Sequence, residues 1–111
     1  MKKIPLMKWR DSNIAGYEWV ITIVLTQRKN KLFSVRAIQV ADEPPVYKTP
    51  LIYPIKNGLE LMYSIKKVFQ DDLISHISIN WSEILENLNK NFPEMQKELS
   101  IALKNSTDSD D

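Results

Sequence analysis

The chain has no cysteine, one histidine and two glycines among its 111 residues. The lack of cysteine excludes disulfides, thiolate nucleophiles and sulfur-ligated metal sites. A single histidine, His76, cannot supply a zinc site that needs three or four nitrogen or sulfur ligands. The glycines, Gly16 and Gly58, stand alone, which excludes the glycine-rich loops that bind nucleotide phosphates. We therefore expect neither a metal nor a cofactor.

Long apolar segments are also missing. The longest run, residues 19–25, contains Thr22 and is far shorter than the roughly 20 residues that cross a bilayer. The basic start, residues 1–6, lacks the apolar stretch of about 7 residues or more that a signal peptide carries. The hydrophobic content of 43% and the charged content of 26% are ordinary for a globular domain. These features predict one cytoplasmic domain without membrane contact.

The net charge of +1 conceals an uneven distribution. Residues 1–56 contain ten basic and four acidic side chains, which gives a net charge of +6. Residues 57–111 contain five basic and ten acidic side chains, which gives a net charge of −5. Such an asymmetry between the two halves indicates that the basic half binds a polyanion.

The N-terminal half has the two-residue periodicity of β-strands. Residues 17–27 alternate over their whole length and are rich in β-branched and aromatic side chains, which predicts a strand. Residues 28–31 predict a turn, and residues 32–40 predict the second strand of a hairpin. Two weaker segments, residues 6–10 and the proline-containing residues 46–55, predict edge or irregular strands.

Local details refine this hairpin. Asn30 is the turn residue that we expect to adopt a positive φ. The apolar set of the second strand changes parity at Ile38 and Val40, which predicts a β-bulge or a strand covered on both faces. Residues 42–45 include two consecutive prolines and predict a loop.

From Asn57 the apolar period becomes helical. Asn57 and Asn80 each precede a glutamate by three residues, which is a form of the capping box, and they predict helices over 58–70 and 81–92. Proline at position 93 predicts the first turn of a further helix over 93–104. The residues expected to face the core are Leu61, Met62, Ile65, Val68, Phe69, Trp81, Ile84, Leu85, Leu88, Phe92, Met95, Leu99, Ala102 and Leu103.

Two segments are less regular. Residues 73–79 alternate weakly and predict either a last strand or a connector. Residues 105–111 have no apolar side chain and predict a disordered acidic tail, either a solvated end or a competitor for the basic half. Residues 1–104 are thus expected to form a single α+β domain, with an antiparallel sheet of three to four strands followed by two or three helices.

The sequence contains no persuasive catalytic set. His76 lies between Ser75 and Ser78, but nearness along the chain does not place three groups in mutual hydrogen-bond reach. The carboxylate pair Asp71-Asp72 resembles the pairs that hold magnesium in nucleases, yet it follows a helix, where such residues are usually solvated. We therefore expect no enzyme, with a magnesium-dependent activity at Asp71 and Asp72 as the least favoured alternative.

The basic half also contains aromatic side chains. Proteins that bind single strands combine cations that follow the phosphates with aromatic rings on which bases stack. We expect Trp19, Phe33 and Tyr53 in the core, because alternation places them on apolar faces. The residues predicted to bind nucleic acid, single-stranded DNA or RNA, are Lys8, Trp9, Arg10, Arg28, Lys29, Lys31, Arg36, Tyr47 and Lys48.

A family resemblance accompanies this pattern. The segment Leu32-Phe-Ser-Val-Arg36, the segment Leu51-Ile-Tyr-Pro-Ile55 and a helix that begins near Asn57 follow one another in the chain. This order over residues 17–70 resembles the single-stranded-DNA-binding domain of the positive cofactor 4 family and, more distantly, the Whirly proteins. The resemblance implies a homodimer with a curved basic groove in which Arg36, Lys29 and Lys48 contact phosphates.

A protein-interaction module is the main alternative. A phage or plasmid inhibitor, an immunity protein or a small assembly subunit would use the apolar faces of 81–92 and 93–104, with Trp81 and Phe92 as anchors. Its affinity for a protein partner would change little with salt. Binding to nucleic acid would instead weaken steeply as salt rises.

Overall fold

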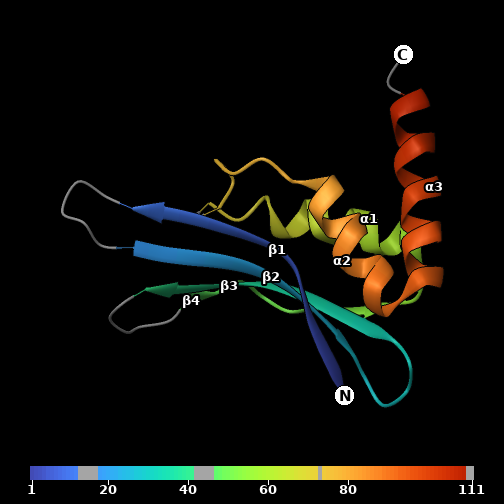
Figure 1. Cartoon of the computed structure of the whole chain (residues 1–111), viewed down its shortest axis with the longest axis horizontal. Coiled ribbons are helices and arrows are strands. Elements are labelled where there is room, and N and C mark those ends of the chain that lie inside the picture. Colours follow the sequence, from blue (N-terminus) through green and yellow to red (C-terminus); the bar gives the residue numbers. More distant parts are fainter. Residues whose placement is uncertain (13–17, 42–46, 73, 110–111) are drawn as a thin grey trace.

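A computed structural model of the chain describes residues 1–12, 18–41, 47–72 and 74–109 and has the α+β architecture that the sequence predicts (Figure 1). In this part of the chain, five strands precede three helices. In chain order the elements are β1 (Lys2–Ser12), β2 (Glu18–Gln27), β3 (Phe33–Ala41), β4 (Tyr47–Lys48), β5 (Ile52–Ile55), α1 (Gly58–Val68), α2 (Trp81–Asn91) and α3 (Pro93–Ser109). None of these helices is long and apolar enough to cross a membrane.

The strands form one antiparallel sheet. β1 pairs with β2, β2 pairs with β3, and β3 pairs with β4 along one part of its length and with β5 along another. The predicted irregular strand is therefore divided in two. At the break, Thr49 bonds to both backbone groups of Ala37 in β3. Its hydroxyl accepts a hydrogen bond from the Ala37 N–H (2.9 Å), and its own N–H donates to the Ala37 carbonyl (3.0 Å).

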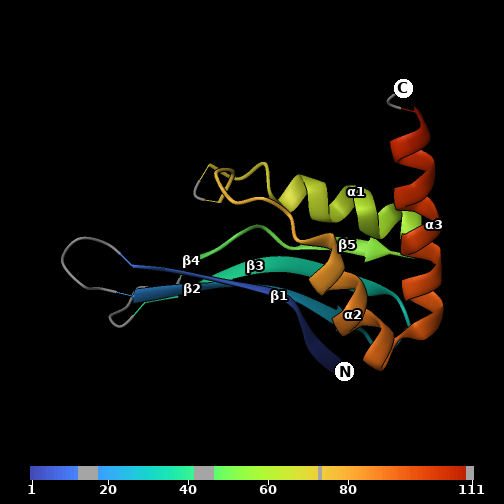
Figure 2. The same cartoon turned by 45° about the horizontal axis from the view of Figure 1, so that its top comes forward.

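The three helices lie on one side of the sheet, as Figures 1 and 2 show, and leave the other side uncovered by any described element. We call the covered side the inner face and the uncovered side the open face. Buried apolar side chains of β2 and β3 meet the predicted apolar faces of the helices. The inner-face set is Ile21, Ile23, Leu25, Phe33, Val35 and Ala37, and its buried helix partners include Leu61, Met62, Ile65, Val68, Ile84, Leu88, Met95, Leu99 and Ala102.

Strand β1 contains a β-bulge. Its register with β2 shifts between Pro5 and Met7, so Leu6 is the extra residue. Lys3 pairs with Thr26 and Lys8 pairs with Thr22, which places both lysines on the open face although an unbroken strand would place them on opposite faces. The bulge therefore gathers three cations of β1, Lys3, Lys8 and Arg10, on the open face, whereas Lys2 lies on the inner face with its Nζ 5.2 Å from the centroid of the Phe92 ring.

The hairpin of β2 and β3 differs from the sequence prediction in two details. The register from Trp19 to Ala41 is continuous, so the change of parity at Ile38 and Val40 is not a bulge. Both residues lie on the open face, so the strand is not covered on both faces either. Val40 is 49% exposed. The positive φ of the turn belongs to Lys31 (71°), not to Asn30. The Asn30 side chain instead accepts a hydrogen bond from the Leu32 N–H at 3.1 Å, which closes the turn.

Side chains of α2 protect the outer edge of β1. The Lys8 N–H donates to Glu83 Oε2 at 2.8 Å, and Asn87 Nδ2 donates to the Leu6 carbonyl at 2.9 Å. These bonds occupy edge groups that would otherwise be open to pairing with another strand. The weak edge strand predicted over residues 6–10 is thus a long strand, because α2 stabilises its free side.

Helix α1 is capped as the sequence predicts. Asn57 Oδ1 accepts from the Glu60 N–H (2.9 Å), and Glu60 Oε1 accepts from the Lys56 N–H (2.9 Å). Helix α3 adds a further partner, because Glu98 Oε1 accepts from the Gly58 N–H at 3.0 Å. Gly58 lies against α3 so closely that an added Cβ would be 2.3 Å from the backbone carbon of Glu98. This glycine is required by helix packing.

The C-terminal prediction needs a correction. Helix α3 continues to Ser109, so residues 105–109, which were expected in a disordered tail, are helical. Lys66 Nζ approaches Ser106 Oγ at 3.5 Å, a contact between α1 and this end of α3. The described residues 74–79 contain no strand and form a connector, with Ile74 and Ile77 buried. The loop expected at 42–45 lies outside the described residues.

Candidate nucleic-acid interface

The open face contains most of the cations that the sequence singles out. Strand register places Lys8 and Arg10 opposite Thr22 and Val20, Arg36 opposite Val24, and Lys48 opposite Ile38. The alternate residues Ile21 and Ile23 face the helices, so all of these side chains share the open face. Its cations are Lys3, Lys8, Arg10, Arg36 and Lys48, and its centre is formed by Val20, Thr22, Val24 and Ile38.

The open face has an excess of positive charge. By the same register, Glu18 of β2 falls on this face opposite Ser12, so in the described part of the sheet five cations stand against one carboxylate. The ion pair Lys97–Glu94 lies on α3. The buried Nε of Arg36 has no hydrogen-bond partner among the described groups. An unsatisfied buried donor costs about 1–3 kcal/mol. The open face therefore has both excess positive charge and a donor that lacks an acceptor.

The turn between β2 and β3 contributes three further cations. Lys29 and Lys31 are exposed at its tip. Arg28 is half-buried, and its Nε donates to Ser34 Oγ at 3.2 Å. Ser34 pairs with Thr26 on the open side of the sheet, so Arg28 connects the turn to the open face.

The two aromatic residues predicted to bind nucleic acid lie on the inner side. Trp9 pairs with Ile21, and its ring contacts His76 edge-on at a centroid distance of 5.5 Å. Tyr47 pairs with Gln39, and its hydroxyl donates to Asp71 Oδ2 at 2.8 Å. Neither ring shares the face of the cations beside it in the sequence. Base stacking by Trp9 and Tyr47 stays a prediction, and the structure gives both rings internal partners.

The contact between Tyr47 and Asp71 predicts an alkaline titration. The hydrogen bond to Asp71 raises the pKa of Tyr47 above its usual value of 10.0, and burial and the charges of Asp71 and Asp72 add to the effect. Because folding raises this pKa, the stabilisation is complete below pH 10.0 and is lost as the pH rises through the folded-state value. We expect Asp71→Asn to lower the pKa of Tyr47 more than Asp72→Asn does, as measured by phenolate absorbance against a Tyr47→Phe reference. Equal shifts in the two variants would contradict the hydrogen bond as the main cause.

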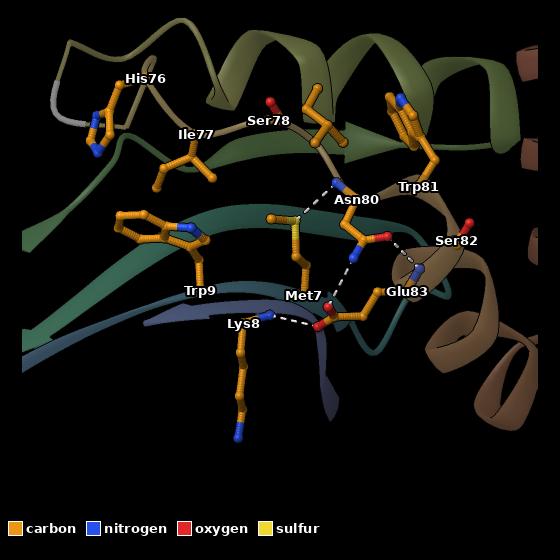
Figure 3. Close-up of a pocket in the computed structure, with 11 residues that line it drawn as sticks. Met7, Lys8, Trp9, His76, Ile77, Ser78, Asn80, Trp81, Ser82 and Glu83 are labelled. Atoms are coloured by element: carbon orange, nitrogen blue, oxygen red, sulfur yellow. Dashed lines mark hydrogen bonds between the residues drawn. The ribbon is translucent and has the colours of Figure 1, made fainter. Parts of the chain in front are cut away.

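The largest cavity described is a cleft of about 720 Å³ between β1 and the start of α2 (Figure 3). Figure 3 shows Trp9 and His76 at one end, Trp81 at the other, and the Lys8 side chain pointing away from the cleft. The Glu83 carboxylate already accepts from the Lys8 N–H and from Asn80 Nδ2 (3.4 Å). Its contacts therefore join α2 to the edge of the sheet.

The acidic and histidine side chains that the sequence singled out lie in and just before the connector that precedes α2. The described residues contain no group of three or more histidine, cysteine, aspartate or glutamate side chains that could hold a metal ion. Ser75 Oγ donates to the Asp72 carbonyl at 3.5 Å, and His76 contacts Trp9. Asp71 accepts from Tyr47. Of the carboxylate pair, Asp71 thus has a structural partner in Tyr47.

Two residues near the open face, Lys3 and Tyr53, were not among the residues predicted to bind nucleic acid. Lys3 was not selected, because only the bulge at Leu6 turns it to the side of Lys8. Tyr53 was expected in the core, and this was wrong, because it is 46% exposed. The signal available in the sequence was the proline beside each of Leu51 and Tyr53. Prolines break an edge strand, and a broken strand does not bury alternate side chains regularly.

Trp81 and Phe92, the anchors predicted for a protein partner, pack within the fold. Trp81 and Phe92 are half-buried and pack against the core, and the rings of Phe33 and Phe92 meet edge-on at 5.0 Å. The apolar face of 81–92 therefore packs against the sheet at β1, and that of 93–104 packs against α1 and α2. No family model, curated protein or solved structure was found to match this chain, so the resemblance to the positive cofactor 4 family stays a prediction.

Proposed function

We propose that the protein binds single-stranded DNA or RNA on the open face of its sheet. The observation that carries the proposal is the grouping of five cations, Lys3, Lys8, Arg10, Arg36 and Lys48, on one face of the sheet. Cations grouped in this way attract a polyanion and release its counterions on binding. The charge asymmetry between the two halves of the chain supports the same conclusion.

The shape of the face favours a single strand. Half-buried Val20, Val24 and Ile38 lie along its centre, with cations on both sides, on β1 and on β3 and β4. Unpaired bases have apolar faces that can pack on such a surface while their phosphates reach the flanking cations. A duplex keeps the faces of its bases stacked inside and offers its backbone and the edges of its bases, so it cannot pack base faces on this surface.

The proposal is tested by fluorescence anisotropy of labelled single-stranded and duplex oligonucleotides across a salt series. We expect tighter binding to the single strand, with log affinity falling by about 0.7 per neutralised phosphate for each tenfold rise in salt. Five open-face cations would give a slope near −3.5 (five contacts at about 0.7 each). Absence of binding at low salt would overturn the proposal.

A protein partner is the second candidate, and a different surface favours it. Leu59 and Tyr63 of α1 and Ile101 of α3 are exposed large apolar side chains, and Leu59 and Ile101 line a groove of about 390 Å³. Exposed apolar patches are common at protein interfaces. A complex formed there would change little in affinity with salt, and Ile101→Ser would weaken it without any effect on oligonucleotide binding.

A further inference from the structure

A corner next to the open face exposes an unusual combination of side chains. The turn between β2 and β3 meets β5 there, around a cleft of about 540 Å³. Its apolar residues, Met1, Leu51 and Tyr53, are all among the exposed large hydrophobic side chains. Its cations are Arg28 and Lys29, and no carboxylate lines it. An aromatic ring beside two cations suits a ligand that is both planar and anionic.

The ring of Tyr53 is held in place by its neighbours. Asn30 Nδ2 donates to the Tyr53 hydroxyl at 2.7 Å, and the Asn30 Oδ1 is itself fixed by the Leu32 N–H. The guanidinium carbon of Arg28 lies 5.8 Å from the centroid of the ring, within the range of a cation–π contact. A ring that is already oriented loses little conformational entropy when a ligand stacks on it.

The corner is continuous with the open face. Arg28 contacts both the Tyr53 ring and Ser34, and Ser34 pairs with Thr26 on the open side of the sheet. Thr26 in turn pairs with Lys3, the first cation of the open face. A strand of nucleic acid that follows these cations would therefore reach Tyr53.

We propose that Tyr53 is a stacking platform for one unpaired nucleobase, with Arg28 and Lys29 binding the adjacent phosphate. This inference rests on the proposed function and adds a position at which the protein contacts a base as well as the backbone. A base inside a duplex cannot present its face to the ring, so the platform selects unpaired nucleotides.

The experiment compares Tyr53→Ala with Tyr63→Ala in binding to two oligonucleotides of equal length, one normal and one abasic. Tyr63 is the matched control because it is an exposed tyrosine on α1, away from the open face. We expect Tyr53→Ala to weaken binding to the normal strand about 10-fold and to leave the abasic strand unaffected. Tyr63→Ala should change neither affinity, and Tyr53→Phe should retain most of the binding because it keeps the ring.

A second measurement detects the stacked base directly by fluorescence. A single strand containing 2-aminopurine should lose fluorescence when wild-type protein stacks one base on Tyr53, and Tyr53→Leu should restore it. Equal weakening of normal and abasic strands by Tyr53→Ala would overturn the platform, as would no weakening of either. Wild-type protein that binds neither strand at low salt would instead refute the proposed function itself.

Discussion

The triple variant Lys8→Gln, Arg10→Gln, Lys48→Gln is expected to bind a single-stranded oligonucleotide about 100-fold more weakly than wild type at about 0.1 M salt. Each removed phosphate contact lowers the salt slope by about 0.7, so three contacts lower it by about 2. The three side chains are exposed on the open face. Their replacement therefore removes charge with little change in packing, and the melting temperature should stay close to that of wild type.

The helix side offers a matched control. Lys67, Lys90 and Lys104 are also exposed, one on each helix, and Lys67→Gln, Lys90→Gln, Lys104→Gln removes the same amount of charge. We expect this control to keep most of the affinity and the full salt slope. If both triple variants lose affinity equally, net charge rather than the open face governs binding. If neither loses affinity, the open face is not the interface.

Gly58→Ala is expected to lower the free energy of unfolding by about 3 kcal/mol, because overpacking between rigid backbones costs roughly 1–3 kcal/mol or more. The new Cβ would lie 2.3 Å from both the Glu98 backbone carbon and the Leu99 nitrogen. These are backbone atoms of α3, so the helix must move, which also weakens the bond from the Gly58 N–H to Glu98. Thermal unfolding should shift down by about 10 °C.

Helix propensity predicts the opposite sign for this substitution. In a helix interior alanine is better than glycine by about 1 kcal/mol, so an isolated α1 would gain stability. Leu59→Ala is the control at the next position, because Leu59 is half exposed and its truncation adds no atom between the backbones of α1 and α3. Denaturant unfolding of both variants separates the effects. A Gly58→Ala protein as stable as wild type would contradict the close approach of α1 and α3.

Local signals were sufficient for most elements. The alternation of residues 17–27 and the caps at Asn57 and Asn80 correctly predict β2, α1 and α2, because consecutive residues contain the whole pattern. The helical faces were also correct, since a period of 3.6 residues fixes which side chains share a side. The end of α3 was predicted wrongly. Its residues are polar and show no apolar period, and the helix is stabilised by its contacts with α1.

The sequence by itself determined the α+β order, the cationic first half and the identity of most candidate residues. Only the tertiary structure decided which side of the sheet each candidate occupies. The bulge at Leu6 turns Lys3 to the side of Lys8, while α2 and the connector enclose Trp9. The broken edge strand leaves Tyr53 exposed, and Asp71 takes the hydroxyl of Tyr47. The physical reason is that the helices bury one face of the sheet through contacts between residues far apart in the chain, which a local period does not contain.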